Sequence, residues 1–216
     1  MSDGERVASG TADPDRSDEE TPAEPEESLE RVPDWDDGYV DRVSDRLFHN
    51  YDLEKEYAVE GERFTLYGRM ELVNQKHVLH PALSFAAHES VEHLFVTRVE
   101  SIDDRTLDRF VDLGDRLADK WIDPDEEHYC TEFTFVTIAS SIPEGVRDRV
   151  SSFDGRTLLK YGFHGHYEIN LVVVAPDERE LVANENADVA TAFRLWDPLE
   201  SEEPGVLGSL VRRLRP

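Results

Sequence analysis

The spacing of hydrophobic residues changes along the chain, and each change predicts an element. Val40 and Val43 begin a helical repeat, which predicts a first helix over residues 36–50. Apolar and polar positions then alternate over residues 53–72, with Gly61 between the two halves of the pattern. This alternation predicts a hairpin with one buried face and one face in water.

Residues 78–87 and 91–99 repeat the strand pattern and predict a second hairpin. Residues 103–122 follow with the clearest helical stripe in the chain, in which large apolar side chains face one way and aspartates the other. We expect this helix to cover a sheet. Phe133 and Phe135 lie on one face of a long strand predicted for residues 128–140.

The longest apolar run, Ile169 to Ala175, is interrupted only by Asn170 and predicts a central strand. The preceding residues form its hairpin partner if the loop is His164-Gly165-His166, because Tyr161 and Phe163 then share a face with the apolar residues after the loop. A short helix is expected to begin at Pro143, and a last helix is expected over residues 188–196.

Runs of consecutive strands favour antiparallel pairing between neighbours in sequence. The order of elements therefore predicts an α+β domain. We expect a mainly antiparallel sheet of about six to seven strands with helices packed on one face.

Acidic residues outnumber basic residues by 49 to 23, and the net charge is −26. Four of the basic residues are lysines and nineteen are arginines. Abundant Asp and Glu with little Lys is typical of proteins that work in molar salt, where screening shortens to about 3 Å and the carboxylates keep the surface hydrated. The composition thus predicts a halophile protein. The cytoplasm is the expected compartment because we expect neither a membrane span nor a signal peptide.

The two ends of the chain differ from the middle. Residues 1–32 hold eleven acids and three arginines with almost no large apolar side chain, which predicts a disordered acidic tail. A single domain is expected over residues 33–198. Residues 199–216 are then a linker and a short basic tail, whose Arg212, Arg213 and Arg215 form the chain's basic run.

Composition also argues against several classes of function. The strong negative charge disfavours binding to nucleic acid, which needs basic patches. No apolar stretch approaches 18 residues, so we expect neither a membrane span nor a signal peptide. Cys130 is the single cysteine, so an internal disulfide and a cysteine-rich metal site are both excluded.

Two clusters contain residues that could bind a metal. In an extended chain His164, His166 and Glu168 share one strand face, and two imidazoles with a carboxylate form a possible half-site for zinc or iron. The hairpin pattern favours the other interpretation, in which His164 and His166 lie in a solvent-exposed turn at the end of the sheet.

The second cluster comprises His88, Glu92 and His93, within the sequence HESVEH. It misses both zinc-protease motifs, HExxH and HxxEH, by one residue, and those motifs require a helix. The residues after it favour a strand, so we expect the cluster to lie at a hairpin turn. A site joining its histidines to His164 or His166 requires the two turns to meet.

Several segments together resemble an uncharacterised family of acidic halophile proteins, a domain of unknown function. They are residues 34–57, 67–99, 111–122, 157–176 and 181–193. The resemblance spans residues 33–198 and implies a stand-alone domain without implying an activity.

No familiar catalytic motif is present in the sequence. The leading hypothesis is therefore a non-catalytic protein-interaction or regulatory module with a protein partner. The alternative is a metal-dependent hydrolase that uses a His/Glu site at the hairpin tips. An interaction module should show an exposed apolar patch or an open sheet edge, and an enzyme should bring at least three of these groups together in a pocket.

Overall fold

The computed structural model describes residues 33–74, 88–125 and 128–197. The predictions for the acidic N-terminal tail, for the strand over residues 78–87 and for the basic C-terminal tail fall outside the described residues. The described elements, in chain order, are α1 (Gly38–Leu47), β1 (Asp52–Val59), β2 (Glu62–Asn74), β3 (His88–Arg98), α2 (Asp104–Trp121), β4 (His128–Ile138), α3 (Glu144–Ser151), β5 (Arg156–Leu158), η1 (Leu159–Gly162), β6 (His166–Ala175), β7 (Glu180–Ala183) and η2 (Asp188–Phe193).

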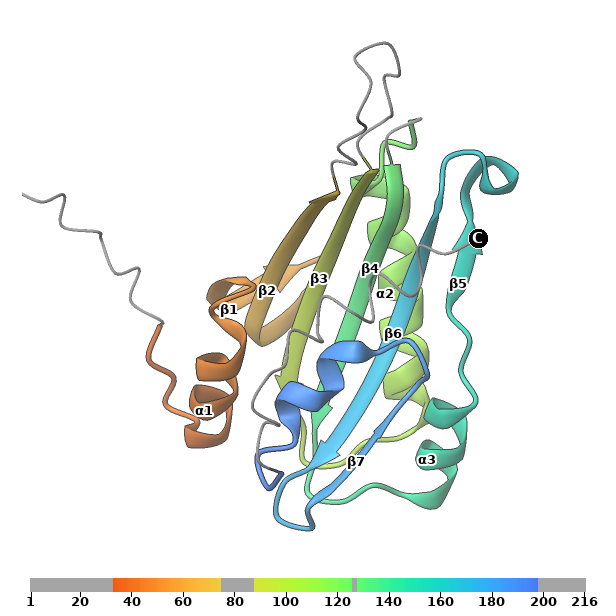
Figure 1. The fold of residues 1–216 in the computed structure, drawn as a ribbon. Helices are drawn as coiled ribbons and strands as arrows, with labels where there is room; N and C mark the ends of the chain where they lie inside the picture. Colours follow the sequence, from red (N-terminus) through yellow and green to blue (C-terminus); the bar gives the residue numbers. More distant parts are fainter. Residues whose placement is uncertain (1–32, 75–87, 126–127, 198–216) are drawn as a thin grey trace, which may run out of the picture. The chain divides into compact units, whose positions relative to one another are not determined.

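Seven strands form one sheet in the order β1-β2-β3-β4-β6-β5, and β7 also pairs with β6 (Figure 1). The pairs β1–β2, β2–β3, β5–β6 and β6–β7 are antiparallel. The α+β class, the strand number and the mostly antiparallel pairing are as predicted. The centre differs, because β3–β4 and β4–β6 are parallel. Helix α2 carries the chain back to the end of the sheet at which β3 begins, so β4 runs in the same direction as β3.

One face of the sheet is covered by α2 and α3. Asp103 caps α2 by accepting a hydrogen bond from the Thr106 backbone N–H at 3.0 Å. The predicted stripe of α2 packs on Phe133 and Phe135, which are 0% and 1% exposed. Gly114 lets the helix approach closely, since a Cβ there would lie 2.8 Å from Ile169 Cδ1.

The other face holds a second core built by α1 and η2. Val40 and Val43 of α1 pack against Val136 and Val172 of the central strands. Helices therefore cover both faces, and the prediction of helices on a single face is wrong. Separate hydrophobic stripes in α1 and α2 did not indicate which face each would cover.

Coverage of this second face is partial. In Figure 1, η2 lies over the carboxyl ends of β3, β4 and β6, and α1 lies beside β1 and β2. No described helix covers the amino ends of β3, β4 and β6 on that side. Among the described helices, none has the length and apolar character needed to cross a membrane.

Three local predictions need correction. The cluster from His88 to His93 lies within β3, because β3 pairs directly with β2. The last helix is the short 3-10 helix η2, and the strand β7 before it was missed because it has four residues. Such short elements carry too few repeats for a periodicity to be visible.

Candidate functional site

Exposed apolar side chains gather at the connection between β5 and β6. Three of the five large apolar side chains that are exposed within the described residues lie here, and we call residues 158–165 the β5–β6 tip. Leu158 is 59% exposed, Tyr161 96% and Phe163 84%. The tip projects from the end of the sheet where β6 begins (Figure 1). Exposed apolar side chains that gather at one place on a surface are a common feature of interaction sites.

The backbone of the tip is closed by its own hydrogen bonds. The Leu159 N–H donates to the Gly165 carbonyl at 3.0 Å, and the Phe163 N–H donates to the Lys160 carbonyl at 3.2 Å. Lys160 and Tyr161 both have left-handed backbones, with φ of 46° and 61°. This conformation costs about 1–2 kcal/mol for a residue with a side chain. The aromatic side chains are therefore displayed on an ordered turn at a conformational cost.

The base of the tip is attached to the start of β4. His128 donates from Nδ1 to the His164 carbonyl over 2.8 Å, and its Nε2 accepts from the Thr131 hydroxyl at 2.9 Å. Gly165 has a φ of +72°, and a Cβ on it would lie 2.2 Å from the Tyr129 carbonyl oxygen. Only glycine fits this contact, so the tip is fixed against a central strand.

The hairpin predicted for β5 and β6 forms, but its loop runs over residues 159–165. His166 pairs with Leu158 inside the sheet and is 7% exposed, so the prediction of a solvent-exposed turn is wrong for this residue. Tyr161 and Phe163 do not extend the strand face. The left-handed backbone at the tip ends β5 before it reaches them.

His166 and Glu168 are brought together by the period of two in β6. His166 Nε2 lies 3.2 Å from Glu168 Oε1, and Arg156 of β5 lies 3.6 Å from the same oxygen. Arg156 also lies 3.5 Å from His166 Nδ1. A guanidinium can only donate, so Nδ1 is the acceptor and the proton of the neutral ring is on Nε2, facing the carboxylate.

Three carboxylates cross the partly covered face in one row. The register pairs Glu92 with Glu132, and Glu132 with Glu168, across the parallel strands β3, β4 and β6. Residues paired in this way point to the same face, about 5 Å apart. Met70 pairs with Glu92 at one end, and Arg156 pairs with Glu168 at the other. We call Glu92, Glu132 and Glu168 the carboxylate row.

Neutral side chains orient the carboxylates of the row. Glu92 accepts from the Tyr51 hydroxyl at 2.7 Å and from the Thr134 hydroxyl at 2.9 Å. Glu132 accepts from the Asn170 amide at 3.1 Å. Burial and the neighbouring charges of Glu92 and Glu132 raise the pKa of Tyr51 well above its ordinary value.

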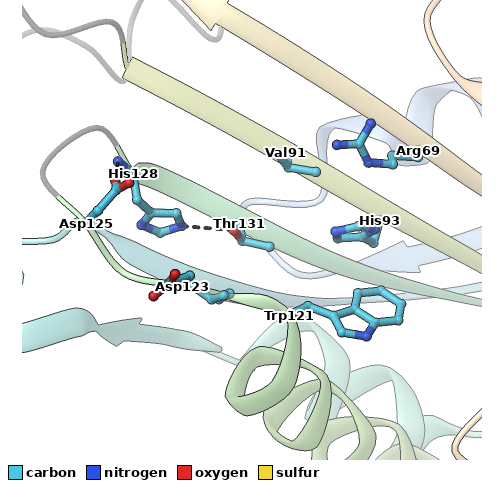
Figure 2. A pocket seen from close by; sticks show the side chains of 9 residues that line it. Arg69, Val91, His93, Trp121, Asp123, Asp125, His128 and Thr131 are labelled. Atoms are coloured by element: carbon cyan, nitrogen blue, oxygen red, sulfur yellow. Dashed lines mark hydrogen bonds between the residues drawn. The ribbon is translucent and has the colours of Figure 1, made fainter.

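A pocket of about 330 Å³ opens on the opposite face, beside the end of α2 (Figure 2). The buried His93 ring stacks on Phe133 and contacts Trp121, with centroid distances of 5.4 and 4.8 Å. His93 Nδ1 lies 2.8 Å from the Tyr67 hydroxyl. Burial, with a smaller contribution from Arg69, lowers the pKa of His93 to about 4. Its ring is neutral at pH 7.

The predicted metal-binding residues are thus divided between two faces. Glu92, His166 and Glu168 face one side of the sheet, whereas the adjacent His93 faces the other. His164 lies in the tip, and the side chain of His88 is outside the described residues. Within the part of the chain that the structure describes, no three His, Cys, Asp or Glu side chains are grouped so that they could hold a metal ion.

Sequence reasoning missed Glu132 and the exposed tip. Glu132 joins the row only through the parallel register of β4, which pattern alone does not give. Tyr161 and Phe163 have the spacing of a half-buried strand, so their exposure was not predicted. The available signal was Gly162 followed closely by Gly165, two residues that favour left-handed backbone.

The chain belongs to the family of a domain of unknown function, DUF8052, whose model matches residues 36–195. The match covers α1 to η2. No curated protein and no solved structure matches the chain.

Proposed function

We propose that the chain is a non-catalytic protein-interaction module and that the β5–β6 tip binds its partner. The observation that carries the proposal is the exposure of Tyr161 and Phe163 on a closed, anchored turn. Rigid aromatic side chains lose little entropy on binding and dominate the affinity of protein interfaces. Strained left-handed residues are also frequent at binding sites, and Tyr161 is one.

We further propose that the module works in the salt-rich cytoplasm of a halophile, which the acidic composition favours. Apolar contacts keep their strength in molar salt, whereas surface ion pairs are screened. An apolar tip on an acidic domain therefore suits recognition in this solvent. The partner is expected to offer an apolar pocket that accepts two aromatic rings.

The binding prediction uses the double variant Tyr161→Ser/Phe163→Ser. We expect it to lose at least about 2 kcal/mol of partner binding, roughly a thirtyfold weakening, because two anchors are removed. Immobilised full-length protein is incubated with source-cell extract in molar KCl, and the retained proteins are quantified by mass spectrometry. A partner identified in this way is then purified, and its affinity is measured directly.

The matched control is Phe48→Ser, which removes another exposed aromatic ring, 38% exposed, next to α1. The control should retain the same partner as the wild type. The proposal is wrong if the double variant keeps its fold and retains every protein that the wild type retains.

A separate prediction concerns salt. Raising KCl from dilute buffer to molar concentration should raise the melting temperature by more than about 5 °C, which corresponds to about 2 kcal/mol in a chain of this size. Screening of the mutual repulsion of 49 acidic residues is the cause. Circular dichroism melts over a KCl series measure the effect. An unchanged or lower melting temperature would contradict adaptation to salt.

A further inference from the structure

The pocket beside the end of α2 carries opposite charges at its two sides (Figure 2). Arg69 and His93 are neighbours across β2 and β3 and lie at one side. Asp123 lies at the other side, just beyond the end of α2. The volume of about 330 Å³ is near the lower end of the range for ligand pockets, about 300–1,000 Å³, so a ligand that fills it is small.

The side that holds Arg69 and His93 offers hydrogen-bond donors. Arg69 forms an ion pair with Glu71 at 2.7 Å through one of its nitrogens, and a guanidinium has five N–H donors in all. His93 is 9% exposed, and its Nδ1 lies 2.8 Å from the Tyr67 hydroxyl. Burial raises the pKa of Tyr67, so the hydroxyl keeps its proton and can donate it to Nδ1.

The neutral His93 ring then carries its own proton on Nε2. Among the described residues, no hydrogen-bond acceptor contacts this nitrogen, and the ring lines the pocket. A guanidinium and an imidazole N–H placed side by side can both donate to one carboxylate, and hydrogen bonds to a charged acceptor are the stronger kind. This side of the pocket therefore suits a carboxylate.

The other side of the pocket suits a cation. Asp123 is exposed and lies two residues beyond Trp121, the last residue of α2. The carboxyl end of a helix bears a partial negative charge, which adds to that of the aspartate. Val91, Trp121 and Ile122 supply apolar surface to the pocket, and the Trp121 ring can contact the ammonium group or the apolar body of a ligand.

We propose that this pocket binds a small zwitterion whose carboxylate and ammonium groups stand at opposite ends of a short apolar chain. Arg69 and His93 bind the carboxylate, and Asp123 binds the ammonium group. A simple anion would be repelled by a chain of net charge −26, and a simple cation would have no partner for the donors of Arg69 and His93. A ligand with both charges separated satisfies both sides of the pocket.

The proposed site goes beyond the binding of a protein partner. None of the three side chains assigned to the ligand belongs to the β5–β6 tip, so either proposal can fail while the other holds. Accordingly, the double variant Tyr161→Ser/Phe163→Ser should bind the zwitterion as the wild type does.

A comparison of two isomers tests the proposal on the full-length wild-type protein. The probe ε-aminocaproate has its charges at opposite ends of a straight chain, whereas its isomer norleucine carries both charges at one end. Isothermal titration calorimetry in molar KCl should show ε-aminocaproate binding at least about tenfold more tightly than norleucine. Caproate and hexylamine, each of which lacks one charge, should also bind at least about tenfold more weakly.

The placement of the two charges is tested by substitution. Arg69→Gln and Asp123→Asn should each weaken the binding of ε-aminocaproate at least about tenfold. The matched control is Asp112→Asn, which removes an exposed carboxylate on α2 outside the pocket and should leave the affinity unchanged. Circular dichroism verifies that each variant keeps its fold.

Three results would overturn the proposal. Two come from the wild type alone, and they are equal affinity for the two isomers and an absence of ε-aminocaproate binding. The third is an equal loss of affinity in Asp112→Asn and Asp123→Asn, because binding would then follow general acidity.

Discussion

Gly165→Ala should lower the free energy of unfolding by several kcal/mol, whereas Gly162→Ala should lower it by only about 1–2 kcal/mol. Both glycines have left-handed backbones, with φ of +72° and +89°. A Cβ on Gly162 meets no atom within 4 Å, but one on Gly165 would lie 2.2 Å from the Tyr129 carbonyl oxygen. The difference between the two variants therefore isolates the contact that fixes the tip to β4.

Urea unfolding of the two variants in molar KCl measures this difference. Gly165→Ala should also weaken partner binding, because relieving the overlap requires the tip to move away from β4. Gly162→Ala should largely preserve binding once its loss of stability is taken into account. Equal destabilisation by the two substitutions would mean that the tip is not packed on β4 in solution.

The features that the sequence predicted correctly are local. The stripe on α2 extends over five turns, and the β1–β2 hairpin has alternation on both sides of Gly61. In both cases the geometry of the backbone fixes the spacing of side chains on one face, and the element is long enough to show several repeats of that spacing. These elements were therefore found with nearly correct bounds.

The parallel centre of the sheet could not be predicted in the same way. Whether β4 pairs with β3 or with another strand depends on how α2 crosses the sheet, which is a long-range choice. The carboxylate row depends on that choice, because Glu92, Glu132 and Glu168 are about forty residues apart in sequence. Their alignment has no signature in any single segment.

The histidine clusters show the same limit. Glu92 and His93 are adjacent in sequence and were grouped as candidate ligands, but neighbours on a strand point to opposite faces. His166 and Glu168, two residues apart, share a face and meet. Once HESVEH is recognised as a strand, the alternation of side chains places Glu92 and His93 on opposite faces of the sheet. His93 is then expected in the core.

The buried position of His93 predicts a pH dependence of stability. Burial lowers its pKa from the ordinary value of 6.5 to about 4, so the unfolded chain binds a proton there more readily than the folded one. Stability is therefore lost as pH falls from about 6.5 to about 4, and it is retained above this range. The shift corresponds to about 3 kcal/mol at the acidic end.

His93→Phe should remove this part of the pH dependence. A phenyl ring can occupy the same stack between Phe133 and Trp121, at the cost of the contact with the Tyr67 hydroxyl, about 1 kcal/mol at every pH. Urea unfolding at pH 7 and pH 4, at constant KCl, gives the stability lost by each protein. The wild type should lose about 3 kcal/mol more than His93→Phe, while His49→Phe, at an exposed position, should behave as the wild type does. Equal losses in the wild type and His93→Phe would show that His93 is not buried as a neutral ring, since titration of the carboxylates is common to both proteins.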